Sequence, residues 1–148
     1  MLGRLLIHTV FSTKHREPVF QDLDLRRQLH AVMAGGVKHL GCIPIQIGGM
    51  SDHVHIFSTL SRTLCVANFV KEVKRSSTNW IQQLGDQYGH FHWQIGYGSF
   101  TVSESNWDDV NNYVLNQEHH HRKMTYQDEF RELLRRHKIE WDEEHVWD

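Results

Sequence analysis

The chain has 148 residues, which is enough for one domain with a hydrophobic core and too few for two domains of ordinary size. Its 16 Lys and Arg residues against 18 Asp and Glu residues give a formal net charge of −2, so nucleic-acid binding would require a local basic patch. The 2 cysteines exclude a disulfide framework, and the chain lacks both a signal-peptide pattern and the roughly 20 apolar residues of a membrane span. We expect a single cytoplasmic domain over residues 1–148.

The first part of the chain predicts a strand followed by a helix. Residues 4–13, RLLIHTVFST, are mainly apolar or β-branched, as in a buried strand, and Pro18 ends that strand. Asp22 suits the N-cap of a helix over residues 24–39, where apolar side chains recur at helical spacing.

The middle of the chain predicts a hairpin and a second helix. Residues 42–50, CIPIQIGGM, alternate as in a strand, and a turn at 48–52 leads into the strand HVHIFSTL at 53–60. We expect these two strands to pair as an antiparallel hairpin. An apolar stripe then predicts a helix over residues 64–84.

The last part predicts a bent strand and two helices. Residues 91–103, FHWQIGYGSFTVS, are aromatic and β-branched with interrupting glycines. Ser103 and the acidic residues after it are typical of a helix N-terminus, so a helix should carry Trp107 and Tyr113. The charged tail predicts a short helix over residues 127–137.

The order of these elements indicates the fold class. Strand, helix, strand, strand, helix, strand is the βαββαβ pattern of a ferredoxin-like α+β sandwich with an antiparallel sheet. One further helix and a C-terminal tail follow. We expect the tail from about residue 122 to be accessory.

Histidine carries much of the chemical information, with 13 residues that are mostly neutral at pH 7 and available as metal ligands. His53 and His55 are two residues apart on a predicted strand, so their imidazoles share one face. Such a pair can share a divalent cation, but a third ligand has to come from elsewhere. Taken alone, the pair favours ordinary packing over a metal site by roughly two to one.

A second group lies in NNYVLNQEHHHRK, residues 111–123. Tyr113 and Gln117 are i and i+4, so they share a helix face, and His120 or His121 continues that face one turn later. A tyrosine close to a metal ion can act as a nucleophile, because the cation lowers the phenol pKa from about 10. The ordinary alternatives are a surface tyrosine and a solvated helix end.

Scattered basic residues are a third feature. They lie in the loop after the first strand and along the helix predicted for residues 64–84, where they are available for phosphate contacts. Singly, such residues more often form a solvated helix face. The candidates for DNA binding are Lys14, Arg16, Lys71, Lys74 and Arg75.

In five segments the chain resembles the single-tyrosine HUH transposases of small insertion sequences, the IS200-like and REP-associated tyrosine transposase group. The segments occur in the expected order over essentially the whole chain: VFSTKHREPVF, GGMSDHVHIF, FHWQIGYGSFTVS, NNYVLNQEHHHRK and FRELLRRHKIEWDEEHVW. The resemblance implies a metal-dependent DNA transposase that cuts and rejoins single-stranded DNA through a 5′-phosphotyrosine intermediate.

The resemblance also implies a role for individual residues. The two strand histidines would bind Mg²⁺ or Mn²⁺, Tyr113 would be the nucleophile on a catalytic helix, and Gln117 would be the third metal ligand. In some relatives a histidine takes the glutamine position, so His120 and His121 remain alternative third ligands. Because metal-bound histidines must be neutral, activity should fall below a pH of about 6.5.

The partners implied by the resemblance are DNA hairpins at element ends and a second copy of the chain in a homodimer, acting on the bacterial nucleoid. Two alternatives stay open. One is a domesticated relative that acts on chromosomal palindromes. The other is a non-catalytic ferredoxin-like module that binds RNA by stacking bases on strand aromatics such as Phe11, Trp93, Tyr97 and Phe100.

Overall fold

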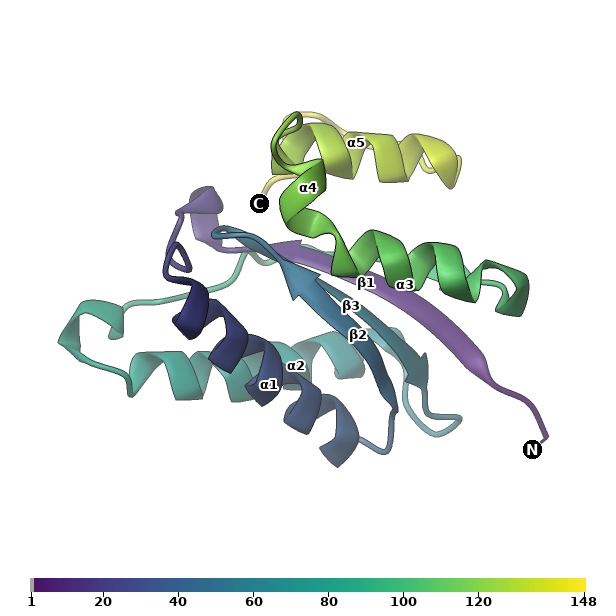
Figure 1. Ribbon diagram of the computed structural model, residues 1–148, viewed down its shortest axis with the longest axis horizontal. Coiled ribbons are helices and arrows are strands. Elements are labelled where there is room, and N and C mark those ends of the chain that lie inside the picture. The colour runs from purple at the N-terminus through teal and green to yellow at the C-terminus, as the bar shows by residue number, and fades with distance from the viewer. Residues whose placement is uncertain (1) are drawn as a thin grey trace.

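The computed structural model describes residues 2–148 and contains one four-stranded sheet with helices on both faces (Figure 1). The strands β1 (Leu5–Ser12), β2 (Pro44–Gly49), β3 (His53–Leu60) and β4 (Gly98–Val102) lie in the order β2-β3-β1-β4, and all neighbours are antiparallel. The helices are α1 (Leu23–His39), α2 (Val66–Gln82), α3 (Trp107–Leu115), α4 (Gln117–His120) and α5 (Tyr126–Arg136). None of these helices, within residues 2–148, is long and apolar enough to span a membrane. The elements up to β4 follow the βαββαβ order, so the expected ferredoxin-like α+β fold is confirmed.

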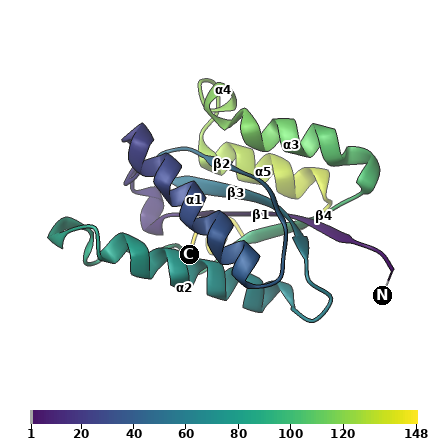
Figure 2. The same cartoon turned by 60° about the horizontal axis from the view of Figure 1, so that its bottom comes forward.

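The face of the sheet covered by α1 and α2 holds the main hydrophobic core (Figure 2). Val54 and Ile56 of β3 enter this core together with Leu29 and Met33 of α1 and Phe69 of α2, and all five are fully buried. Burying a side chain of this size stabilises the fold by about 1.5–3 kcal/mol. The register of β3 is therefore fixed, because a shift of one residue would turn Val54 and Ile56 to the other face of the sheet.

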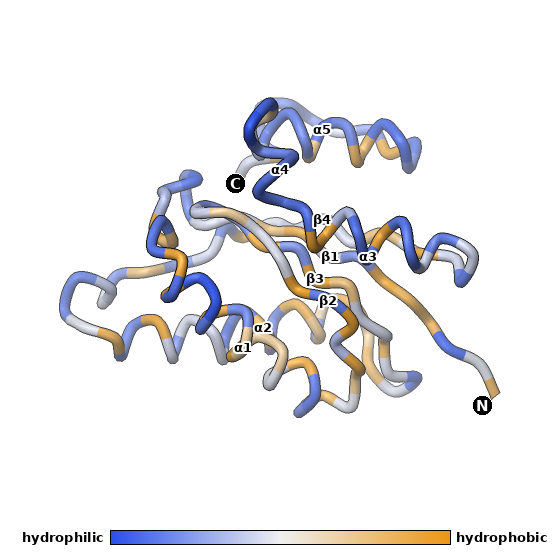
Figure 3. The backbone as a smooth tube through the Cα atoms, viewed as in Figure 1, coloured by the Kyte–Doolittle hydropathy of each residue, from blue (hydrophilic) through white to orange (hydrophobic). Residues whose placement is uncertain are grey.

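The opposite face is covered by α3 and α5, and its apolar residues form two separate clusters. Val114 of α3 shares one cluster with Phe57, and Phe130 of α5 shares the other with Val10. The chain that joins these helices, at α4 and the start of α5, is hydrophilic (Figure 3). The charged tail thus packs on the sheet through one apolar side of α5.

Two helix starts follow from capping side chains. The carboxylate of Asp22 accepts a hydrogen bond from the Leu25 backbone N–H at 2.9 Å, which confirms the predicted N-cap of α1. At α5, the Thr125 hydroxyl accepts one from the Asp128 N–H at 3.2 Å. This helix agrees with the prediction for residues 127–137 to within one residue at each end.

The strand predicted for residues 91–103 is wrong in its first half. Only Gly98–Val102 pairs regularly with β1, and before it Trp93 forms an isolated antiparallel bridge with Thr13. Before it, the Lys74 ammonium donates hydrogen bonds to the carbonyl oxygens of residues 94, 95 and 96 at 2.7, 3.1 and 2.9 Å. Because these three carbonyls converge on one side chain, this stretch cannot continue the ladder of the sheet.

Candidate metal centre and nucleophile

Two histidines point from β3 toward the face covered by α3 and α5. His53 and His55 have no exposed surface, while Val54 between them lies in the core on the other face. Protein therefore surrounds both imidazoles on every side. Buried imidazoles of this kind need polar partners.

Both imidazoles are held through Nδ1. His53 Nδ1 lies 2.7 Å from Oδ1 of Asp52, and His55 Nδ1 lies 2.8 Å from Nε2 of His8 on β1. Each ring therefore presents Nε2 to the groups on α4 and α5. A partner on one ring nitrogen, with the other nitrogen facing inward, is the usual arrangement of a histidine metal ligand.

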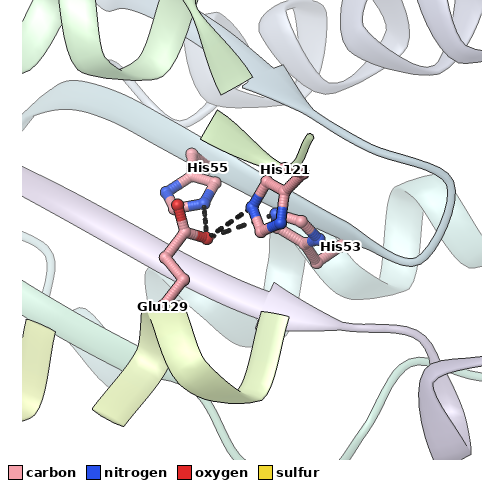
Figure 4. A group of neighbouring side chains, drawn as sticks. All are labelled: His53, His55, His121 and Glu129. Atoms are coloured by element: carbon pink, nitrogen blue, oxygen red, sulfur yellow. Dashed lines mark hydrogen bonds and ion pairs between the residues drawn. The ribbon is translucent and has the colours of Figure 1, made fainter. Parts of the chain in front are cut away.

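The carboxylate of Glu129 on α5 lies where the imidazoles converge (Figure 4). Its Oε1 is 2.8 Å from His55 Nε2, 3.0 Å from His121 Nε2 and 3.4 Å from His53 Nε2. These four side chains offer ligand atoms that all lie within 4.8 Å of one another. Imidazole nitrogen combined with carboxylate oxygen suits a divalent cation such as Mn²⁺, so the donor set fits the metal ion that the sequence implied.

Gln117 belongs to the same cluster. Its side chain is buried, with Oε1 at 3.0 Å from His53 Nε2 and at 3.1 Å from His121 Nε2, and its amide donates to Glu129 Oε2 at 2.9 Å. The helix expected to carry Tyr113 and Gln117 together is interrupted, because Asn116 has φ −98° and ψ 27° between α3 and α4.

The two alternative third ligands differ in their position. His121 contacts Gln117 and Glu129 through Nε2, and its Nδ1 lies 2.7 Å from the Met124 carbonyl oxygen. His120 instead packs its ring on Tyr113, with ring centroids 4.6 Å apart. The structure thus brings His121 to the histidine pair and leaves His120 beside the tyrosine.

Tyr113 shares the carboxylate of Glu129 with the histidines. Its hydroxyl donates to Glu129 Oε2 at 2.5 Å, and its ring centroid is 5.8 Å from that of His55. Burial and the negative charge of Glu129 raise the pKa of Tyr113 above its usual value. The side chain is therefore a neutral phenol with a fixed hydroxyl direction.

The charges in the cluster balance one another. Burial alone would raise the pKa of Glu129, but His55, His121 and His53 outweigh burial and hold that pKa well below its usual range. Burial lowers the pKa of His53, yet Asp52 and Glu129 together raise it to about 9. In the absence of a cation, Glu129 is thus an anion paired with a protonated His53.

Three of the five predicted DNA-binding residues lie apart from this cluster. Lys71, Lys74 and Arg75 are on α2, which covers the opposite face of the sheet (Figure 2). Lys74 binds backbone carbonyls and burial lowers its pKa to about 8, while Arg75 pairs with Glu72. A DNA strand bound at the histidines would therefore have to pass round an edge of the sheet to reach these three residues.

The two residues of the first loop have different surroundings. Arg16 borders a cavity of about 630 Å³ that His121 also lines, and its guanidinium donates to the Trp147 carbonyl oxygen at 2.6 Å. Lys14 is exposed and borders a separate cavity of about 170 Å³. Of the five basic residues, Arg16 is therefore the one beside the cluster.

Sequence reasoning missed Glu129 and His8. Glu129 falls on the apolar stripe of α5, between the buried residues Tyr126 and Phe130, and an acidic residue at such a position was the available signal. His8 stands in an apolar strand on the face that Leu6 also occupies. Its contact with His55 depends on the pairing of β1 with β3.

Comparisons with known proteins identify the family and the fold. The family model described as "Transposase IS200 like" matches residues 2–117. A solved structure from Deinococcus radiodurans R1, described as a candidate transposase, has 23% sequence identity and a TM-score of 0.63, and the match covers 79% of this chain and 93% of that one. A comparison with curated proteins gives no match.

A second solved structure is described as a REP-associated tyrosine transposase bound to a REP hairpin. It has 13% identity and a TM-score of 0.56, and the match covers 78% of this chain and 67% of that one. At these identities, both structures show a common fold. Because the family model spans the whole sheet, both strand histidines, Tyr113 and Gln117, the chain belongs to the family of IS200-like transposases.

Proposed function

We propose that this transposase cuts and rejoins single-stranded DNA, with Tyr113 as the nucleophile and a divalent cation, Mg²⁺ or Mn²⁺, at the histidine cluster. One observation carries the proposal: a single buried carboxylate, that of Glu129, contacts the Tyr113 hydroxyl through one oxygen and the histidine nitrogens through the other. A nucleophile and a cation site that share a carboxylate can act on the same phosphate.

The metal ligands in this proposal are His53 and His55 through Nε2, with Gln117 as the third. His121 is the alternative third ligand, and Glu129 Oε1 is within reach of the same position. When bound, a divalent cation supplies Lewis-acid stabilisation of the charge that develops on the phosphate oxygens.

Tyr113 carries the covalent step. Its phenolic oxygen attacks the phosphorus atom in line, the bond from phosphorus to the 3′-oxygen breaks, and the tyrosine ends as a 5′-phosphotyrosine. Glu129 Oε2 accepts the hydrogen bond of the phenol and so fixes the direction of the attacking oxygen, and the proton that the phenol loses is balanced by the proton that the leaving 3′-oxygen takes up. Attack by a second 3′-hydroxyl reverses the step and joins the strands, which requires no nucleotide cofactor.

DNA hairpins and a homodimer are part of the proposal. The structural relative with a bound REP hairpin supports hairpin recognition through the shared fold. An RNA module that stacks bases on strand aromatics is disfavoured, because Phe11, Trp93 and Phe100 are buried and only Tyr97 is partly exposed.

A covalent adduct tests the proposed function. The protein is incubated with Mn²⁺ and single-stranded DNA that contains hairpins from the flanks of its own gene, and a phosphotyrosine adduct is sought on a denaturing gel. We expect the adduct with the unchanged chain and none with Tyr113→Phe. An adduct that persists in Tyr113→Phe contradicts the role of this tyrosine.

A further inference from the structure

A cavity of about 440 Å³ lies beside the metal centre, between α1, the end of β2 and α4. Gln117 forms part of its wall, and the same side chain contacts His53, so the cavity borders the proposed site of cleavage. The volume is within the range of pockets that bind small ligands, which is about 300–1,000 Å³.

Gly48 and Gly49, at the end of β2, line part of this cavity. A Cβ atom at Gly48 would lie 2.1 Å from the Val114 carbonyl oxygen, so the end of α3 rests directly on β2. Because this leaves no space for a side chain between α3 and β2, the position of α4, which follows α3 directly and whose Gln117 lines the cavity, is also restricted.

The charge on the walls is predominantly positive. Arg26 is buried and fixed, with its guanidinium donating to the Phe20 carbonyl oxygen at 3.0 Å and to Glu118 at 3.3 Å. Arg27 and Arg122 are exposed, and within residues 2–148 neither forms an ion pair. Two unpaired guanidinium groups at the mouth of a cavity are suited to phosphate oxygens.

One polar atom inside the wall has no partner. His30 borders the cavity, and its Nε2 is buried without a hydrogen bond to any of the described residues. Burial, Arg26 and His53 lower the pKa of His30 to about 4, so the ring is neutral at pH 7. A neutral imidazole has one donor and one acceptor nitrogen, and either can bond to the edge of a base.

We propose that this cavity binds one nucleotide of the single strand next to the phosphate attacked by Tyr113, with its phosphates on Arg27 and Arg122 and its base against His30. The inference rests on the proposed function, because it places the nucleotide relative to that reaction. The family match ends at Gln117, so Arg122 lies outside it. This chain would therefore use a residue of its own tail to hold the strand.

Binding of a labelled single-stranded oligonucleotide of randomised sequence tests the phosphate contacts. In the Tyr113→Phe background, the double change Arg27→Gln and Arg122→Gln should weaken binding at least about tenfold and reduce the salt slope by roughly 1.4, about 0.7 for each lost contact. A matched control, Lys38→Gln with Arg62→Gln, removes the same charge from exposed positions outside the cavity and should have little effect. Equal losses in both double variants overturn the proposal.

The base contact needs a separate readout. His30→Leu removes the unpartnered nitrogen. When the oligonucleotides that bind the protein are sequenced, this variant should lose the preference of the unchanged chain for a particular base at one position and keep it at the others. His39→Leu, an exposed histidine of the same helix, should retain the full preference. An unchanged preference in His30→Leu contradicts the proposed base contact.

Three further outcomes distinguish a free nucleotide from single-stranded DNA as the ligand, and a failure of the cavity proposal from a failure of the proposed function. If deoxynucleoside monophosphates lose affinity in the arginine double variant while the oligonucleotide binds unchanged, the cavity serves free nucleotides and the inference fails. If the unchanged chain forms its tyrosine adduct but the arginine variant binds DNA normally, only the cavity proposal fails. If the unchanged chain forms no adduct, the proposed function fails.

Discussion

Glu129 is the residue on which the cluster depends. A buried carboxylate is tolerated only when hydrogen bonds and opposite charges replace its water. Glu129 satisfies this requirement with imidazole nitrogens around Oε1 and with the Tyr113 hydroxyl and the Gln117 amide at Oε2. Its two oxygens thus link the groups of the metal site to the nucleophile.

Replacing this carboxylate by an amide should weaken metal binding. Glu129→Gln keeps the size of the side chain but removes its charge, so we expect the Mn²⁺ affinity to fall by about tenfold to a hundredfold. Isothermal titration or Mn²⁺ electron paramagnetic resonance measures this directly. Glu132→Gln, a partly exposed position on the same helix, is the matched control and should bind Mn²⁺ normally. Identical affinities in the two variants contradict a role for Glu129 at the metal.

The raised pKa of His53 makes one stability contribution depend on pH. Its folded value of about 9 lies above the ordinary 6.5, so protonated His53 stabilises the fold fully below pH 6.5 and this contribution disappears as the pH rises through about 9. In EDTA, Asp52→Asn should therefore lower the free energy of unfolding by about 1–2 kcal/mol below pH 6.5 and by much less above pH 9. Urea unfolding at several pH values measures the difference. As a control, the effect of Asp52→Asn on the free energy of unfolding should not depend on pH in a His53→Gln background. If Asp52→Asn alone lowers this free energy equally at every pH, protonated His53 does not make the proposed contribution to stability.

At this scale, the sequence indicated those features that depend on local spacing. The alternation of His53 and His55 placed both on one face, and the structure has them there. The interruption at Asn116 could not be read from the i and i+4 spacing of Tyr113 and Gln117. Glu129 was beyond reach because its neighbours come from β3 and α4, and their proximity depends on tertiary packing.

At the scale of elements, close backbone contact fixes the position of α3 and α4. A Cβ atom at Gly48 of β2 would lie 2.1 Å from the Val114 carbonyl oxygen, so there is no room for a side chain between the two backbones. The position of α5 depends instead on its apolar side, through Tyr126 and Phe130. The tail that we expected to be accessory thus carries a helix that packs on the sheet.

Two glycine changes should have opposite effects. Gly48→Ala puts a methyl group against the Val114 carbonyl oxygen and should lower the free energy of unfolding by about 1–3 kcal/mol. Gly35→Ala lies within α1 with nothing within 4 Å of the new Cβ, so it should raise that free energy by about 0.4–1 kcal/mol. Urea unfolding of both variants measures the effects. A Gly48→Ala protein as stable as the unchanged chain would mean that β2 and α3 are not in such close contact.

Most elements could be predicted from periodicity and caps, since these depend on neighbouring residues. Asp22 marked the start of α1, the apolar spacing marked α2, and the charged tail indicated the helix α5. The first half of the strand predicted for residues 91–103 was wrong because its backbone carbonyl oxygens accept hydrogen bonds from Lys74, which lies some twenty residues earlier in the chain. Composition alone carries no information about such a distant partner.

At the scale of the whole molecule, one chain brings together all the groups of the proposed reaction. Tyr113 and the histidine pair lie side by side within the same subunit, with ring centroids of Tyr113 and His55 5.8 Å apart. A homodimer would therefore contain two separate sites, each built from its own chain.

Mixing of inactive variants tests this arrangement. Tyr113→Phe lacks the nucleophile, and His53→Ala with His55→Ala lacks the metal ligands. If each site uses its own tyrosine, a mixture of the two proteins should form no DNA adduct under conditions in which the unchanged chain does. An adduct in the mixture would mean that the tyrosine reaches the histidines of a second copy.

The sheet has a consequence for the length of DNA that the protein can recognise. Because it separates the basic residues of α2 from Tyr113, a DNA strand that touches both has to bend round a sheet edge. Short oligonucleotides would fill the catalytic face and leave Lys71 open to chemical modification. Protection of Lys71 should therefore begin only above a threshold length, and that length measures the footprint of the protein on its target.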